Sequence, residues 1–213
     1  MTPLRDLSVG LVLTGTAGFI DAVGFIALGG FYTSFMSGNT TQLGTGLATG
    51  AGWALALPAG LVALFFIGSY LGSLAAQIAG HWGPVATLGI VVVGIATSLA
   101  LHAAGFGPAQ SMLALAGAAG AQNAVLRPSG AARLGATFVT GTLFAAGQDL
   151  ARATVGDAPR WRWAQHLVVW ASLCAGALIG GLAYGQWQMS ALYVPAVIYL
   201  IYLIWFAFRH PQT

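Results

Sequence analysis

The sequence predicts an all-α polytopic transmembrane helical bundle of about six to eight membrane segments, built from two homologous halves with interrupted helices near the midplane. Composition, a series of apolar windows and an internal repeat lead to this prediction. Of the 213 residues, 58% are hydrophobic and only 5% are charged, and the mean hydropathy is +0.83. Soluble domains carry roughly 25% charged residues because water must wet their surface. The composition therefore excludes a soluble globular domain.

Eight apolar windows approach or exceed the length of about 20 residues that a helix needs to cross a bilayer. They cover residues 8–30, 33–50, 53–79, 84–104, 109–126, 134–151, 163–184 and 190–208. The second and the sixth are the most polar. Because serine, threonine, asparagine and glutamine crowd the second window, we expect it to be a broken or re-entrant helix. We expect one transmembrane domain over residues 1–213 in contact with the lipid bilayer.

The arginines set the expected orientation. A cytoplasmic N-terminus and eight crossings would place five of the seven arginines inside, leaving Arg127 and Arg133 outside. Basic residues favour the cytoplasmic side. Arg5 before an apolar run also resembles a secretory signal, but the pattern around Asp21 recurs later in the chain, so we interpret this window as mature structure.

Three sequence patterns recur in the same order in the two halves of the chain, 102 to 108 residues apart, which is typical of duplication. The matching pairs are residues 21–23 with 123–125, 34–39 with 137–142, and 68–72 with 176–180. The repeats are predicted to cover about 8–104 and 109–208. Secondary transporters are often built this way, with a site between the halves. Four crossings per half would make the repeats parallel and three would make them inverted.

Asp21 lies near the middle of an otherwise apolar stretch. An aspartate at a helix centre costs roughly 2.5 to 3.5 kcal/mol on insertion scales, so it should face a cavity or a partner. One interpretation makes it a protonatable or cation-coordinating group of a translocation path. The other is a structural ion pair with Arg127. Its counterpart in the second half is Asn123, which follows Gln122.

Gly38 and Gly141 each lie among hydroxyl and amide side chains and are predicted helix breaks. A half-helix that begins here would aim its free N–H groups at a polar or anionic group. Small and hydroxyl residues also hold membrane helices together without a ligand, and that alternative stays open. The predicted substrate-binding residues are Asp21, Ser37, Asn39, Thr40, Gln122, Asn123, Thr140 and Thr142.

Two further patterns are expected to be structural. The Gly-x-x-x-Gly pairs predict close helix packing, inside the chain or in a homo-oligomer; they are Gly68 with Gly72 and Gly176 with Gly180. Asp149 and Arg152 have the i, i+3 spacing of a salt bridge on one helix.

Enzyme and nucleic-acid functions lack the residues they need. The chain has no glutamate, no phosphate-binding loop and no Ser-His-Asp arrangement that spacing favours. Its lone Cys174 and four scattered histidines give no metal-ligand pattern, so neither a metal nor another cofactor is expected. The arginines form no basic stripe, which argues against a nucleic-acid partner.

The segments around Asp21 and Gly38 carry a family resemblance. Residues 18–25 read Gly-Phe-Ile-Asp-Ala-Val-Gly-Phe and residues 35–41 read Phe-Met-Ser-Gly-Asn-Thr-Thr, followed in the second half by 122–124 and 137–142. With these elements the chain resembles the YoaK-type family of bacterial integral membrane proteins, a domain of unknown function. The resemblance implies a polytopic protein of the bacterial inner membrane and carries neither a substrate nor catalytic residues.

We therefore expect a small transporter or facilitator that moves a small polar or weakly anionic solute through a site between the repeats, with proton coupling if Asp21 titrates. The alternative is a non-transporting scaffold or accessory subunit whose polar residues are structural. A water-accessible cavity that reaches Asp21 favours transport, whereas a dry axis with Asp21 sealed against Arg127 favours the scaffold.

Overall fold

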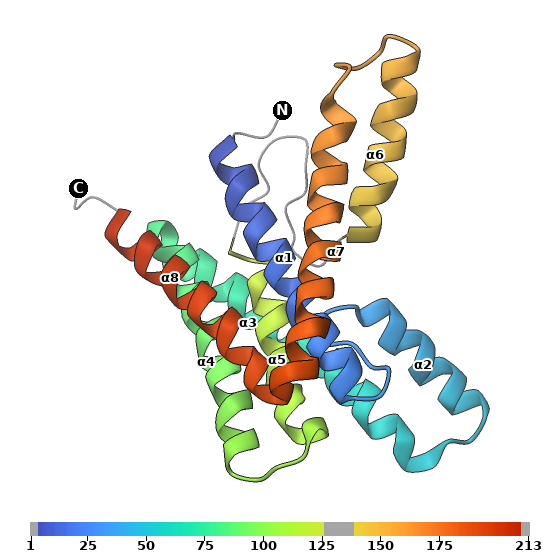
Figure 1. The fold of residues 1–213 in the computed structure, drawn as a ribbon, viewed down its shortest axis with the longest axis vertical. Helices are drawn as coiled ribbons and strands as arrows, with labels where there is room; N and C mark the ends of the chain where they lie inside the picture. Colours follow the sequence, from blue (N-terminus) through green and yellow to red (C-terminus); the bar gives the residue numbers. More distant parts are fainter. Residues whose placement is uncertain (1–3, 126–138, 210–213) are drawn as a thin grey trace.

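The computed structural model describes residues 4–125 and 139–209, and in these residues the chain is helical, with short 3-10 turns and no strands (Figure 1). Each of the eight predicted windows overlaps one α-helix. The α-helices are α1 (Leu4–Ala27), α2 (Met36–Ala48), α3 (Ala56–Ile78), α4 (Gly83–Ala103), α5 (Pro108–Gln122), α6 (Val139–Thr154), α7 (Arg162–Trp187) and α8 (Tyr193–Arg209). The 3-10 turns are η1 (Gly52–Leu55), η2 (Gly80–Trp82) and η3 (Gln188–Leu192).

Among the residues that the structure describes, four helical stretches are long and apolar enough to cross a membrane. They are Leu7–Ala27, Gly52–Ile78, Gly80–Ala103 and Arg162–Arg209, and the last contains both α7 and α8. By contrast, the 13 residues of α2 make a helix about 20 Å long, at 1.5 Å per residue. The hydrocarbon core of a bilayer is about 30 Å thick. Alone, α2 is too short to cross it.

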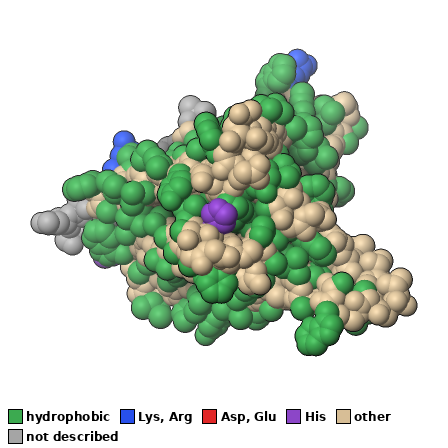
Figure 2. All heavy atoms as spheres, turned by 60° about the horizontal axis from the view of Figure 1, so that its bottom comes forward, with side chains coloured by type: hydrophobic (Ala, Val, Ile, Leu, Met, Phe, Trp, Pro, Cys, Tyr) green, Lys and Arg blue, Asp and Glu red, His purple; other side chains and the backbone are tan. Residues whose placement is uncertain are grey.

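Large apolar side chains cover the outside of the bundle, as the composition requires. Phe66, Ile78 and Phe208 are more than two-thirds exposed. Figure 2 shows a face with many hydrophobic side chains, with arginine only at its margins, a histidine near its centre and no aspartate in view. Such a surface is stable against lipid tails and not against water.

Glycines bring α1 and α7 into backbone contact. A Cβ atom at Gly176 would overlap the backbone of Gly15, and one at Gly180 would overlap the backbone of Phe19. The Ser172 hydroxyl donates a hydrogen bond to the carbonyl oxygen of Leu11. These contacts advance along both helices together, so α1 and α7 run parallel.

The helices α3 and α5 are joined in the same manner. A Cβ at Gly68 would overlap the backbone of Gly117, and a Cβ at Gly72 would lie 2.7 Å from the Cα of Ala121. All four glycines of the Gly-x-x-x-Gly pairs therefore pack against other helices of the same chain. Of the two expected kinds of packing, this is the one inside the chain. Their missing side chains allow the close approach on which membrane helix association depends.

The remaining helices are arranged unevenly around these two pairs. The helix α4 packs closely along α5, where Gly94 faces Ala114 and Ala118, and α8 packs on α4. Few contacts join α1 to α8. The helices α2 and α6 extend outward from the centre in different directions, each beside the first part of the following long helix (Figure 1).

Candidate functional site

An irregular segment between α1 and α2, residues 28–35, forms the base of the site. Positive φ angles of 66° at Gly29 and 111° at Gly30 turn the chain back, and these are conformations that glycine adopts readily. The backbone N–H and C=O groups that follow have no helical partners. In apolar surroundings each unsatisfied group would cost several kcal/mol, so side chains have to bind them.

Asp21 of α1 binds the end of this segment through four hydrogen bonds. Its Oδ1 accepts from the backbone N–H groups of Thr33 (2.9 Å) and Ser34 (2.7 Å) and from the Thr33 hydroxyl (2.7 Å). Its Oδ2 accepts from the Ser34 hydroxyl. All four donors are neutral and suit an ionised carboxylate, which can only accept.

Asn39 and Gln42 bind the same segment from α2. The fully buried Asn39 accepts from the N–H of Tyr32 (3.0 Å) and donates to the Tyr32 carbonyl oxygen (2.7 Å). The Gln42 side chain donates to the carbonyl oxygen of Gly30 (2.8 Å). Three amide or carboxylate side chains therefore fix the path of the chain directly before α2.

A cavity of about 430 Å³ lies beside Asp21. Its wall includes parts of α1, α6 and α7 together with Tyr32, Ser34 and Phe35, so segments far apart in the sequence meet there. The polar lining residues are Asp21, Tyr32, Ser34 and Thr140, and the aromatic ones include Phe25, Phe35 and Trp170. A site that is mostly apolar with a few convergent polar groups is typical of small-molecule binding.

A second cavity of about 250 Å³ lies at the beginning of α2. Ser37 and Met36 line it from α2, Phe65 from α3 and Gly141 from α6. Ser34, Phe35 and Thr140 line both cavities, which are therefore neighbours. The first turn of α2 faces this second cavity.

The structure brings together only part of the predicted set. Asp21, Ser37 and Thr140 line the two cavities, whereas Asn39 lies behind them. The other four line neither cavity. Thr40 is exposed and donates a hydrogen bond to the carbonyl oxygen of Met36, and Thr142 is buried. The side-chain amide of Gln122 donates to the carbonyl oxygen of Leu13, and that of Asn123 donates to the carbonyl oxygen of Ala119. Arg127, the proposed partner of Asp21, lies outside the described residues.

Gly38 is not a helix break, and this corrects the sequence interpretation. It lies within the first turn of α2, and Gly141 lies close to the first described residue of α6. The interruption precedes α2, at residues 28–35. Gly38 instead leaves room for two aromatic rings, because a Cβ there would lie 2.8 Å from the ring of Phe35 and 3.1 Å from that of Tyr32.

Sequence reasoning missed Thr33, Ser34 and Tyr32, the residues that surround Asp21. Thr33 and Ser34 are consecutive hydroxyl residues after a Gly-Gly turn and before a polar helix. An acid in the apolar span upstream needs donors, and that need was the available signal.

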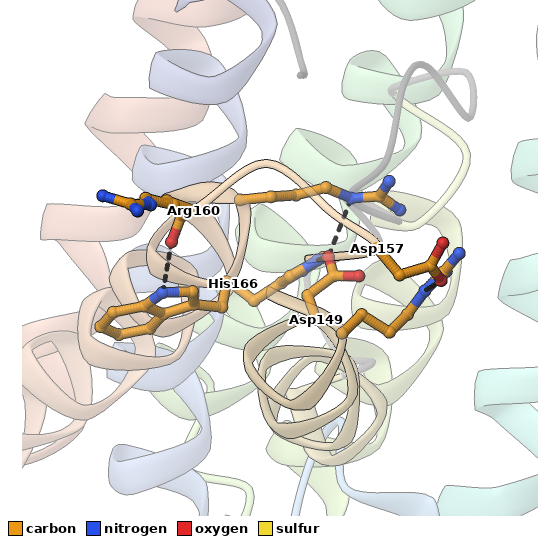
Figure 3. Close-up of polar contacts among 7 residues, drawn as sticks. Asp149, Asp157, Arg160 and His166 are labelled. Atoms are coloured by element: carbon orange, nitrogen blue, oxygen red, sulfur yellow. Dashed lines mark hydrogen bonds and ion pairs between the residues drawn. The ribbon is translucent and has the colours of Figure 1, made fainter. Parts of the chain in front are cut away.

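A separate polar cluster joins α6 to α7 (Figure 3). The Oδ2 atom of buried Asp149 lies 2.8 Å from Nε of Arg162 and 3.2 Å from Nε2 of buried His166. Arg152 pairs instead with Asp157, at 3.1 Å. The expected Asp149 to Arg152 salt bridge is therefore wrong: α7 packs against α6 and supplies nearer partners from across the helix pair.

No metal site is evident in the part of the chain that the structure describes. Nowhere in residues 4–125 and 139–209 do three histidine, cysteine or aspartate side chains gather closely enough to hold an ion.

Comparison of the sequence with known proteins finds a family and a transmembrane relative. Residues 9–205 match the family model described as "Protein of unknown function (DUF1275)". The chain is 34% identical over 212 residues to the UPF0700 transmembrane protein RA0705 of Rhizobium meliloti (strain 1021), covering 98% of this chain and 90% of that relative. No solved structure matches.

Proposed function

The chain belongs to the DUF1275 family of unknown function, and from this premise we propose that it is a small transporter or facilitator that moves a polar solute through the Asp21 cavity. That it is an integral membrane protein follows from its apolar helices and its transmembrane relative. One observation carries the proposal: a carboxylate lines a cavity of about 430 Å³ inside a membrane protein. A buried ionisable group in a membrane span costs free energy and is by default a functional residue.

We propose further that the fold consists of two repeats, with α1 to α4 equivalent to α5 to α8. The supporting observation is the pair of glycine contacts. Gly117 and Ala121 follow Gly15 and Phe19 by 102 residues, and Gly176 and Gly180 follow Gly68 and Gly72 by 108. A Cβ at Gly176 would lie 2.6 Å from the carbonyl carbon of Gly15, and one at Gly68 would lie 2.6 Å from that of Gly117. At these two pairs of glycine positions the two interfaces have matching contacts, which supports the repeat.

The directions of the helices favour inverted repeats. In Figure 1 α1 runs downward from the N-terminus, whereas α5 runs upward. If α2 is too short to cross, each half crosses the membrane three times. Because three is an odd number, the second repeat begins on the opposite side and is inverted relative to the first. The Asp21 cavity then lies between the halves, since α1 and residues 32–35 come from the first and α6 and α7 from the second. Inverted repeats with a site at their interface are typical of secondary transporters.

The two halves are packed unequally, and this supports alternating access as the mechanism. The close α4 to α5 interface is equivalent by repeat to α8 against α1, where contacts are few. A transporter with inverted repeats can exchange these arrangements, so that α8 closes on α1 while α4 moves away from α5. In that exchange the Asp21 cavity would face each side of the membrane in turn.

A cross-link tests the exchange. Gly94 of α4 faces Ala118 of α5, so a Gly94→Cys, Ala118→Cys pair in a Cys174→Ser background should form a disulfide. Oxidation should stop solute flux and reduction should restore it, while either single cysteine variant should be unaffected by oxidation. Undiminished flux through the fully cross-linked protein would contradict alternating access by this movement.

Substitution of Asp21 tests both the site and proton coupling. Purified protein in proteoliposomes should show uptake that an imposed pH gradient stimulates, and Asp21→Asn should reduce uptake at least tenfold and remove the stimulation. Asp157→Asn is the matched control because Asp157 is an exposed surface residue. Gradient-dependent uptake by Asp21→Asn at the wild-type rate would refute the role of this carboxylate.

One observation favours the scaffold alternative. Asp21 and Asn39 both bind the backbone of residues 32–34, which is a structural task. A scaffold of this kind would transport no solute. Its Asp21→Asn variant would be less stable than the wild type, with no transport activity to lose in either protein.

A further inference from the structure

The Asp21 carboxyl has no cationic partner among the described residues, so in its ionised form it would place an uncompensated negative charge beside the cavity. The four groups that bind Asp21 are two amides and two hydroxyls, which stabilise a carboxylate without neutralising it. None of the described ion pairs includes Asp21. Oδ1 accepts three hydrogen bonds, whereas Oδ2 accepts one and retains the capacity for another.

Aromatic rings line the cavity around this charge. Phe25 and Tyr32 lie with their ring centroids 4.9 Å apart, and Tyr32 and Phe35 lie 5.1 Å apart in an edge-to-face arrangement. Trp170 of α7 completes the aromatic part of the lining. The faces of such rings attract cations through their quadrupole, and tryptophan does so most strongly.

We propose that the Asp21 cavity binds a small organic cation, an ammonium or quaternary ammonium compound, whose charge faces Asp21 and whose carbon groups contact the rings. This inference rests on the proposed function, because it names the solute class of the same site. It favours a cation over the weakly anionic solute expected from sequence, since an anion would meet the like charge of Asp21. A bare metal ion fits poorly, because it needs several oxygen ligands and the lining is mainly apolar.

Three probes of nearly equal shape isolate the effect of charge. Choline is a quaternary ammonium alcohol, 3,3-dimethyl-1-butanol is its uncharged carbon isostere, and 3,3-dimethylbutyrate is a related anion. Isothermal titration calorimetry on the purified full chain should show choline binding at least tenfold more tightly than the uncharged alcohol, and the anion more weakly still. Equal affinity for choline and the alcohol, or tighter binding of the anion, would overturn the proposal.

Variants locate the preference. Asp21→Asn should bring choline within about threefold of the alcohol, whereas the matched control Asp157→Asn should retain the full difference. Should Asp21→Asn fail to fold, Trp170→Leu leaves every hydrogen bond of Asp21 in place and should still weaken choline more than the alcohol. An unchanged preference in Trp170→Leu, or an equal loss in Asp157→Asn, contradicts the assignment. So does choline binding that appears only in Arg127→Gln, because the chain would then supply the cation itself.

Flux measurements separate this inference from the proposed function. Proteoliposomes that take up choline but not its isostere support both. Uptake of the alcohol or the anion in preference to choline keeps transport and overturns the solute class. Selective choline binding without flux of any of the three keeps the solute class and overturns transport.

Discussion

Two aspartates of this membrane protein are held in opposite ways. Asp149, between α6 and α7, lies 2.8 Å from Arg162, which supplies a cationic partner, and 3.2 Å from the imidazole of His166 (Figure 3). Asp21, which lines the Asp21 cavity, is bound only by neutral donors among the described residues. Both groups are expensive in apolar surroundings. The difference indicates that Asp149 stabilises a helix pair, and it motivates our proposal that Asp21 binds the charge of a solute.

The largest expected effect comes from separating the helices that carry the two sites. Gly176→Ala places a methyl group on the backbone of Gly15, and α1 and α7 have to move apart. We expect a loss of about 3 kcal/mol or more, seen as little folded protein in size-exclusion chromatography. Gly185→Ala on the same helix meets nothing within 4 Å and should behave as wild type.

Neutralising each aspartate tests the comparison directly. Asp149→Asn leaves Arg162 and His166 without their anion, and we expect a loss of about 2 to 3 kcal/mol, because Arg162 keeps partial access to solvent. Asp21→Asn retains an acceptor oxygen for its donors and should cost about 1 kcal/mol. Equilibrium unfolding of both variants in the same detergent shows which one loses more free energy of unfolding. A greater loss for Asp21→Asn would contradict our interpretation.

Asn39→Ala tests the support behind Asp21. The Tyr32 N–H and C=O groups would lose their side-chain partner in a buried position, at a cost of about 1 to 2 kcal/mol. Because Tyr32 lines the cavity, we expect choline affinity to fall severalfold as well. Thr40→Ala, an exposed change on the same helix, should alter neither; equal losses in the two variants would show a general effect on α2.

The smallest effect is expected at the surface pair beside the Asp149 cluster. Arg152 and Asp157 have side chains that are 48% and 68% exposed, and exposed ion pairs contribute about 0 to 1 kcal/mol. Arg152→Ala should change the melting temperature by no more than one or two degrees. A loss as large as that of Asp149→Asn would restore the pairing predicted from sequence.

The positions of the helices were predictable, because hydropathy and helix length depend on local sequence. Each predicted window overlaps an α-helix, including the short, polar α2. The importance of Asp21 was also accessible, since an acid in an apolar span always needs an explanation.

The partners of the buried polar groups were less predictable, because they depend on the path of an irregular segment. Gly38 attracted attention as a break, yet the turn lies at Gly29 and Gly30, where positive φ angles reverse the chain. Helical spacing indicated Arg152 as the partner of Asp149, and only the packing of α7 on α6 brings Arg162 nearer. Tertiary contacts decide both cases, and local spacing does not report them.

The crosswise pairing of α1 with α7 and of α3 with α5 has a consequence for assembly. Each glycine interface joins one helix of the first four to one of the last four. Neither group of four therefore contains both sides of an interface among the described residues. Cleavage between Ala104 and Pro108 would yield two fragments, and each would expose to lipid the glycine surfaces that normally pack on the other fragment. We expect such fragments to be degraded when expressed singly and to recover a common fold when produced in one cell.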